Sequence, residues 1–62
     1  MGWRREIRDR IAELEQRRLR VEDERKRARM LGEPEGERLE AEAKAHLQEL
    51  SQQINDLQAS LE

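Results

Sequence analysis

Apolar residues recur along the first half of the chain at the three- and four-residue steps of an α-helix. The residues that stand at seven-residue intervals are Ile7, Leu14, Val21 and Ala28. The position that alternates with them is occupied by Arg4, Ile11, Arg18 and Arg25. This heptad spacing is typical of a coiled-coil seam, and it lacks the strict alternation of a β-strand. The pattern therefore predicts a helix over about residues 3–31, with arginines interrupting its apolar stripe.

The second half of the chain carries a more continuous apolar stripe. Its members are Leu39, Ala43, Leu47, Leu50, Ile54, Leu57 and Leu61. These residues again follow steps of three and four, so they share one face of a helix. The pattern predicts a second helix over about residues 36–61.

Between the two stripes lies the segment RMLGEPEGER, which holds the only proline and two of the three glycines of the chain. Gly32 suits the left-handed position that ends a helix, and Pro34 suits the first turn of a new one. The heptad phase also slips by one residue across this segment, and a proline inside one continuous helix would cost about 3 kcal/mol. We therefore predict a turn at residues 32–35, set by Gly32 and Pro34.

Folding the chain back at this turn brings the two stripes together. The fold-back places Leu14 opposite Leu57 and Val21 opposite Leu50. The sequence thus predicts an all-α fold: an antiparallel two-helix coiled-coil hairpin, formed by residues 1–62 as one domain. The expected buried seam consists of Ile7, Ile11, Leu14, Val21, Leu39, Leu47, Leu50, Ile54, Leu57 and Leu61.

Acid–base pairs at the i,i+4 spacing support both helices, because such side chains are neighbours on a helix surface. The expected pairs are Glu6–Arg10, Glu13–Arg17, Glu22–Lys26, Asp23–Arg27 and Glu40–Lys44. In the hairpin, Arg25 is expected near His46.

The short length predicts that this hairpin associates with another helix. A chain of 62 residues with 34% hydrophobic and 45% charged residues has little apolar surface to bury. Chains below about 70 residues rarely gain more than a few kcal/mol from one core. We expect a homo-oligomer, a dimer forming a helical bundle, or a complex with a partner protein helix. Leu19 and Met30 point away from the predicted seam and are candidate contacts.

Charge is unevenly distributed between the halves, although the net charge is only −2. Residues 1–31 carry eleven Arg or Lys against seven acids, a net of +4. Residues 32–62 carry two against eight, a net of −6. Opposite net charges favour pairing of the two halves.

The sequence lacks the residues that several classes of function require. There is no cysteine for a disulfide or a thiolate metal site. No apolar run reaches the length of a membrane span, and no signal-peptide pattern is present. No nucleophile–base set or phosphate-binding glycine loop is found. We expect a cytoplasmic, non-enzymatic protein without cofactor, small-molecule ligand or membrane contact.

His46, the only histidine, lies on one helical face with Glu42 and Glu49. This spacing suits a metal ion, but three ligands on one helix are a weak site, and Arg25 is expected nearby, where it would repel a cation. We expect no metal site and interpret His46 as a solvated residue beside the seam.

The arginines of the first half leave nucleic-acid binding as an alternative function. The candidate phosphate contacts are Arg4, Arg5, Arg8, Arg17, Arg18, Arg20, Lys26 and Arg27. However, these residues scatter around the helix, and acidic residues lie among them. A solvated, salt-paired surface is therefore the favoured interpretation.

The run GEPEGERLEAEAKAHLQELSQQINDLQASL resembles the return helix of known hairpins. Glu33, Pro34, Glu37, Arg38 and Leu39 are similar to the acidic-proline turn and ERL start in the middle-domain coiled coil of bacterial protein disaggregases. The run also resembles the antiparallel finger of Rho-effector homology repeats and the tRNA-gripping arm of seryl-tRNA synthetases. Its architecture is similar to Rop-like hairpins that dimerise into four-helix bundles. The resemblance implies a hairpin module, and it adds a third alternative: a regulatory coiled-coil finger of a larger ATPase or effector.

Overall fold

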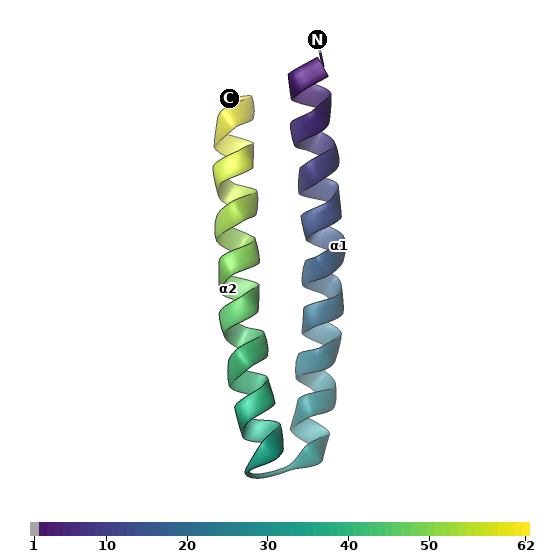
Figure 1. Cartoon of the computed structure of the whole chain (residues 1–62), viewed down its shortest axis with the longest axis vertical. Coiled ribbons are helices and arrows are strands. Elements are labelled where there is room, and N and C mark those ends of the chain that lie inside the picture. Colours follow the sequence, from purple (N-terminus) through teal and green to yellow (C-terminus); the bar gives the residue numbers. More distant parts are fainter. Residues whose placement is uncertain (1) are drawn as a thin grey trace.

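The chain forms a hairpin of two long helices (Figure 1). A computed structural model describes residues 2–62. Helix α1 spans Gly2–Leu31 and helix α2 spans Glu35–Leu61. The predicted all-α hairpin is confirmed. The second helix begins one residue earlier than expected, so the turn consists of only three residues.

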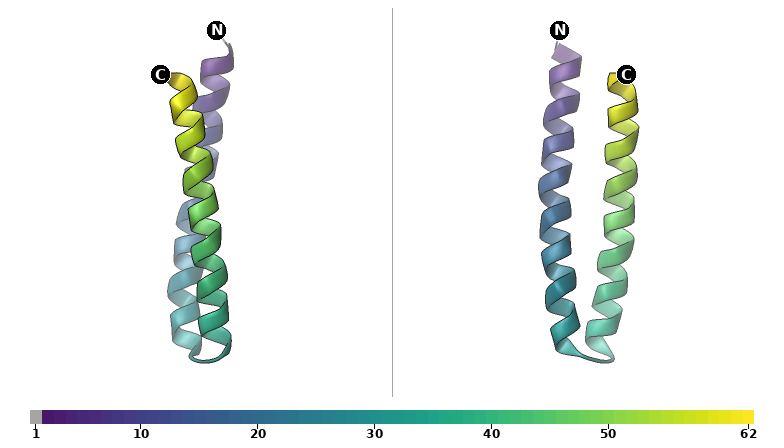
Figure 2. Two further views of the ribbon diagram at one scale, coloured as in Figure 1. Left: turned by 90° about the vertical axis from the view of Figure 1, so that its left-hand side faces the viewer. Right: turned by 180° about the vertical axis from the view of Figure 1, so that it is seen from behind.

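The two helices lie side by side along most of a rod that is 49 Å long. Figure 2 shows that they cross at a shallow angle and that both chain ends lie at the same end of the rod. We call this the open end, and the other the turn end. Because the helices run antiparallel, residues near position 30 in α1 meet residues just after position 35 in α2.

The turn is built from Gly32, Glu33 and Pro34. Gly32 has a φ of +71°, a left-handed conformation that costs residues with a Cβ roughly 1–2 kcal/mol. The Gly36 N–H donates to the Gly32 carbonyl at 2.7 Å, and the Arg38 N–H donates to the Pro34 carbonyl at 3.2 Å. The Glu33–Pro34 peptide bond is cis. Pro34 immediately precedes α2, where its missing N–H leaves no helical hydrogen bond unmade.

Burial follows the heptads on both helices. The buried apolar residues are Ile11, Leu14, Val21, Ala28, Ala43, Leu50 and Ile54. The half-buried apolar residues packed against them are Ile7, Leu47, Leu57 and Leu61. Arg18, Arg25 and Glu40 are also half-buried, and they occupy heptad positions of the same stripes. The core is therefore one narrow line of apolar side chains, and half-buried charged residues occupy the remaining heptad positions.

The closest approach of the helices lies next to the turn. Gly36 is buried, and a Cβ placed on it would collide with the carbonyl oxygen of Ala28. Only a glycine permits this approach. This contact and the three-residue turn shift α2 relative to α1. Facing residues now lie symmetrically about residue 33, two to three residues earlier than the fold-back expected from the sequence.

Candidate interaction surface

The ten residues expected in the seam occupy three different environments. Ile11, Leu14, Val21, Leu50 and Ile54 are buried. Ile7, Leu47, Leu57 and Leu61 are half-buried against them. Leu39 is exposed. Because two helices cover a seam from only two sides, Ile7, Leu57 and Leu61 near the open end stay partly in contact with solvent.

Leu39 departs from the predicted seam, since 39% of its surface is exposed. The heptad positions that face α1 in this part of α2 are Gly36, Glu40 and Ala43. Leu39 precedes Glu40 by one residue, so it is rotated about 100° from the seam, onto a flank of the hairpin. The apolar character of Leu39 misled the prediction, whereas the seven-residue spacing from Leu47 correctly points to Glu40.

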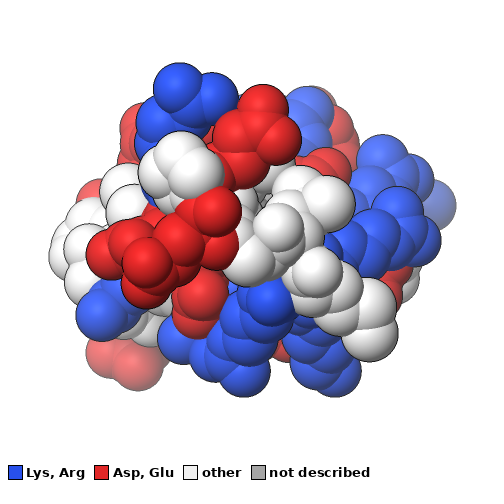
Figure 3. Space-filling view, turned by 90° about the horizontal axis from the view of Figure 1, so that it is seen from below, with Lys and Arg blue, Asp and Glu red and all other residues white. Residues whose placement is uncertain are grey.

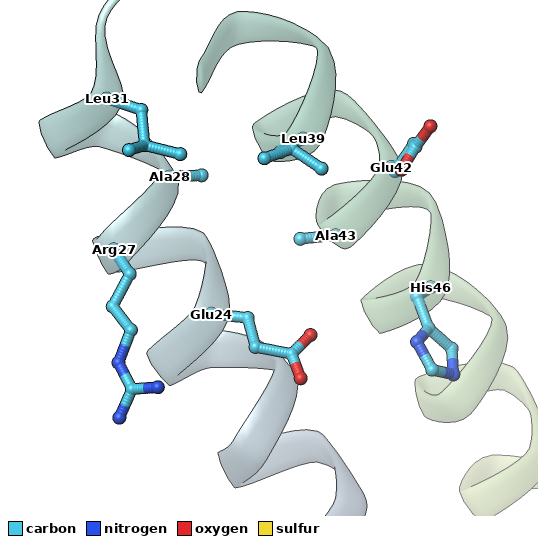
Figure 4. A pocket seen from close by; sticks show the side chains of 8 residues that line it. All are labelled: Glu24, Arg27, Ala28, Leu31, Leu39, Glu42, Ala43 and His46. Carbon is cyan, nitrogen blue, oxygen red and sulfur yellow. The ribbon is translucent and has the colours of Figure 1, made fainter. Parts of the chain in front are cut away.

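A groove opens on that flank at the turn end, with a volume of about 390 Å³. Figure 4 shows Leu31 of α1 and Leu39 of α2 reaching toward each other, with Ala28 between them and Ala43 next to Leu39 along α2. The two alanines are buried but short, so they form a floor that leaves the leucines uncovered. Leu31 is 60% exposed. The result is a small apolar surface made by both helices.

Charged residues border this groove. They are Glu24 and Arg27 from α1 and Glu42 and His46 from α2. Figure 4 shows Glu24 directed toward the α2 side, while Glu42 lies at the outer edge of α2. Glu24, Glu42 and His46 take part in none of the ion pairs found among residues 2–62. These three side chains are therefore free to meet a group outside the hairpin. We call these four residues the rim.

On the opposite flank, two arginines of α1 converge on Glu40. Arg29 Nε donates to Glu40 Oε1 at 2.9 Å, and Arg25 Nε lies 3.6 Å from the same oxygen. The hydrogen bond from Arg29 lowers the pKa of Glu40, and the positive charges of Arg29 and Arg25 act in the same direction. These ion pairs join the two helices beside the turn.

The expected approach of Arg25 to His46 is not what the structure shows. Arg25 pairs with Glu40, whereas His46 lies on the rim with Glu24. The cause is the short turn, which shifts the pairing so that Arg25 meets a residue nearer the turn. The Nε atom of Arg25 is buried and has no partner within hydrogen-bonding distance among residues 2–62. Glu40 neutralises its charge without bonding to that nitrogen.

The basic residues of α1 are largely interleaved with acids. Arg10 and Arg17 each lie 3.1 Å from Glu13, and Arg27 lies 2.8 Å from Asp23. The predicted pairs Glu13–Arg17 and Asp23–Arg27 are thereby confirmed. Arg10 pairs with Glu13 rather than with Glu6, and Glu40 pairs with α1 rather than with Lys44.

Among the other candidates for phosphate contact, only Arg18 is half-buried. Arg4, Arg5, Arg8, Arg20 and Lys26 are exposed. The Arg4 guanidinium lies 5.3 Å from the centroid of the Trp3 ring, within cation–π range. The exposed basic residues are distributed over several faces of α1 and do not line one continuous groove.

The turn end shows the charge asymmetry directly. In Figure 3, acidic side chains gather mainly on the side of α2, and Lys and Arg side chains lie mainly on the side of α1. Three of the acids, Glu33, Glu35 and Glu37, belong to the turn and the start of α2. Carboxylates at a helix N-terminus interact favourably with its exposed N–H groups.

Within residues 2–62, no three His, Asp or Glu side chains are grouped so as to hold a metal ion. Neither α1 nor α2 has an apolar stretch that would span a bilayer. No protein-family model matches the chain, and comparisons with curated proteins and with solved structures give no significant match.

Proposed function

We propose that this protein is a non-enzymatic protein–protein interaction module: an antiparallel coiled-coil hairpin that self-associates or docks a helix of a partner protein. The incomplete burial of its apolar residues supports this proposal most directly. Among residues 2–62 seven apolar side chains are buried, but Ile7, Leu47, Leu57 and Leu61 remain half-exposed along the seam. Each side chain gains roughly 1.5–3 kcal/mol on full burial, so covering them by a further helix is favourable.

The groove at the turn end adds a second reason. Leu31 and Leu39 are exposed side by side on one flank, and their surroundings carry unpaired charges. Clustered exposed apolar residues with a polar border are typical of protein interaction sites, whereas isolated ones such as Leu19 are common on any surface.

The ion pairs of α1 favour this function over a nucleic-acid-binding arm. Arg10, Arg17 and Arg27 are held by acids of their own helix, and Arg25 and Arg29 are held by Glu40. A phosphate would have to displace a carboxylate at each of these positions. Titration with duplex DNA and mixed RNA at low and high salt tests the alternative, which requires binding at low salt that weakens as salt is added.

Static light scattering with circular dichroism tests the proposed function. Near 100 µM the chain should be helical, and its mass in solution should exceed the 7.4 kDa of a monomer. A fully helical monomer at this concentration would remove self-association from the proposal. The proposed setting is the cytoplasm, and fractionation of cells that express the chain tests this point.

A further inference from the structure

We infer that the groove at the turn end binds a second copy of the same chain, in a dimer whose two turns lie at the same end. In this arrangement a two-fold axis runs parallel to the long axis of the hairpin. It places Leu31 and Leu39 of one copy against Leu39 and Leu31 of the other. The inference rests on the proposed function, and it specifies the partner, the face and the orientation.

The first argument is geometric. Rotation about an axis parallel to the helices keeps every residue at its own height along the rod. It also exchanges the sides of the hairpin, so α1 of one copy faces α2 of the other. Figure 4 shows the Leu31 and Leu39 side chains facing each other across the groove, so they lie at similar heights. Each leucine then meets its counterpart from the other helix, and four leucines surround the axis.

Charge complementarity supports the same arrangement. Arg27 and Glu42 border the groove on opposite helices. The rotation therefore sets Arg27 of each copy against Glu42 of the other. Arg27 already pairs with Asp23 of its own helix, but both side chains of that pair are exposed, so exchanging Asp23 for another carboxylate costs little. One heptad farther from the turn, the same rows of the helices carry Arg20 and Glu49, which also have opposite charges. Arg20 and Glu49 are both exposed.

Glu24 and His46 complete the match. Both border the groove, one from each helix, and neither has an ion-pair partner among residues 2–62. The rotation brings Glu24 of one copy toward His46 of the other. All these contacts occur twice, because a two-fold interface uses the same patch on both molecules and closes on itself.

The reverse arrangement, with the turns at opposite ends, is less favourable. It sets α1 against α1 and α2 against α2, so helices of like net charge face each other. It also moves Leu39 away from Leu31 of the other copy, toward the open end, where Gln53 and Ser60 occupy the corresponding positions of α2. In the parallel-axis dimer, by contrast, helices of opposite net charge alternate around the bundle. Electrostatic complementarity of this kind fixes orientation more than it adds affinity.

A distance measurement between two spin labels tests the arrangement. The chain has no cysteine, so Met30→Cys provides one labelling site per copy. Met30 is 89% exposed and close to the turn. Turns at the same end should bring the labels within about 35 Å, given helix spacings of about 8–10 Å. Turns at opposite ends should separate them by about 40 Å or more, since residue 30 lies roughly 20 Å from the middle of α1.

Two matched variants test the face. Leu39→Glu should weaken dimerisation about 100-fold, because each dimer loses two buried leucines. Leu19→Glu is the control, because Leu19 is an exposed leucine, at 59%, that does not border the groove. It should leave the dissociation constant unchanged. Equal weakening by both variants would overturn the assignment of the face.

A charge exchange between copies tests the proposed pairing. Arg27→Glu and Glu42→Arg should each weaken their own homodimer about tenfold. An equimolar mixture of the two variants should form a heterodimer more stable than either homodimer, because both interchain pairs are then restored with reversed sign. Circular dichroism of each variant alone checks that the hairpin still folds.

These results separate the inference from the proposed function. A dimer with labels about 40 Å or more apart would overturn the orientation and leave self-association intact. A chain that remains monomeric at about 100 µM would overturn both this inference and the self-association on which it rests. A dimer with short label distances, disrupted by Leu39→Glu alone, is the expected result.

Discussion

The two ends of the hairpin differ in the side chains that fill the seam. Toward the open end, Leu14, Leu50 and Ile54 fill the seam with large, buried side chains. Toward the turn, the same heptad positions are occupied by Ala28, Gly36 and Ala43, together with the charged residues Arg25 and Glu40. The helices are therefore held together by large apolar side chains near the open end. Near the turn they are held by close approach of their backbones and by ion pairs.

The two ends should therefore contribute differently to the stability of the hairpin and to its association with a partner. The large side chains Leu14, Leu50 and Ile54 are almost fully buried and hold the helices together. The small ones bring the helices close but leave Leu31 and Leu39 uncovered beside the seam. Stability should therefore be most sensitive to substitutions in the half near the open end, and association to substitutions around the groove at the turn end. The following substitutions test how stability differs between the two ends, in order of decreasing expected effect.

Leu14→Ala should be the most damaging of these changes. Leu14 is 1% exposed, and truncating a buried leucine typically costs about 2–5 kcal/mol through lost burial and a residual cavity. The free energy of unfolding, measured by urea titration at fixed protein concentration, should fall by an amount in this range. Leu19→Ala, at an exposed position, should change it by less than about 0.5 kcal/mol. Similar effects at both positions would contradict the assigned seam.

Gly36→Ala adds only one methyl group, but it should destabilise the hairpin more than the other substitutions near the turn. Its Cβ collides with the backbone carbonyl of Ala28, which cannot rotate away as a side chain does. Overpacking of this kind costs about 1–3 kcal/mol, although alanine is otherwise the better helix former. Thermal unfolding followed by circular dichroism measures the loss. Gly2→Ala, which meets open space at the start of α1, is the control and should not destabilise the hairpin.

Gly32→Ala should have a smaller effect, about 1–2 kcal/mol, because its left-handed φ of +71° disfavours a Cβ. Space is not the limiting factor here, since nothing lies within 4 Å of the added atom. Gly32→Asn should therefore recover part of the loss, because asparagine tolerates this conformation better. Thermal unfolding of both variants measures the difference. Equal destabilisation by the two residues would argue against a purely conformational cause.

Glu40→Gln should have the smallest effect, and one that depends on pH. The hydrogen bond and charge of Arg29, with the charge of Arg25, lower the pKa of Glu40 in the folded chain relative to the unfolded chain. The stabilisation is therefore fully present above the unfolded pKa of about 4.3 and is lost as the pH falls through the folded value. Wild type should exceed Glu40→Gln in stability at pH 7. The difference should shrink as the pH falls below the unfolded value and vanish below the folded pKa of Glu40, and a constant difference would contradict the pairing.

Much of the fold is readable from the residues themselves. Heptad spacing in both halves predicts two helices with facing stripes. Gly32 and Pro34 predict where the chain reverses, because one suits a left-handed helix end and the other a helix start. These signals are local, so they survive without knowledge of the packed structure.

The details beside the turn depend on packing that the pattern does not contain. Leu39 looks like a seam residue because it is a leucine, but Glu40 holds the heptad position and is stabilised there by Arg29 and Arg25. The contact of Gly36 with Ala28 then sets how far the helices are shifted. The groove follows from this shift. Its one sequence signal is the run of small residues at facing heptad positions.

The central claim is that this hairpin is marginal alone and gains stability by associating through its uncovered apolar surface. The most direct test is the thermal unfolding midpoint of the helical signal, measured at about 2 µM and about 200 µM protein. If association is coupled to folding, the midpoint should rise by roughly 5–10 °C over this range. A midpoint that does not change with concentration, in a chain that unfolds cooperatively, would contradict the account.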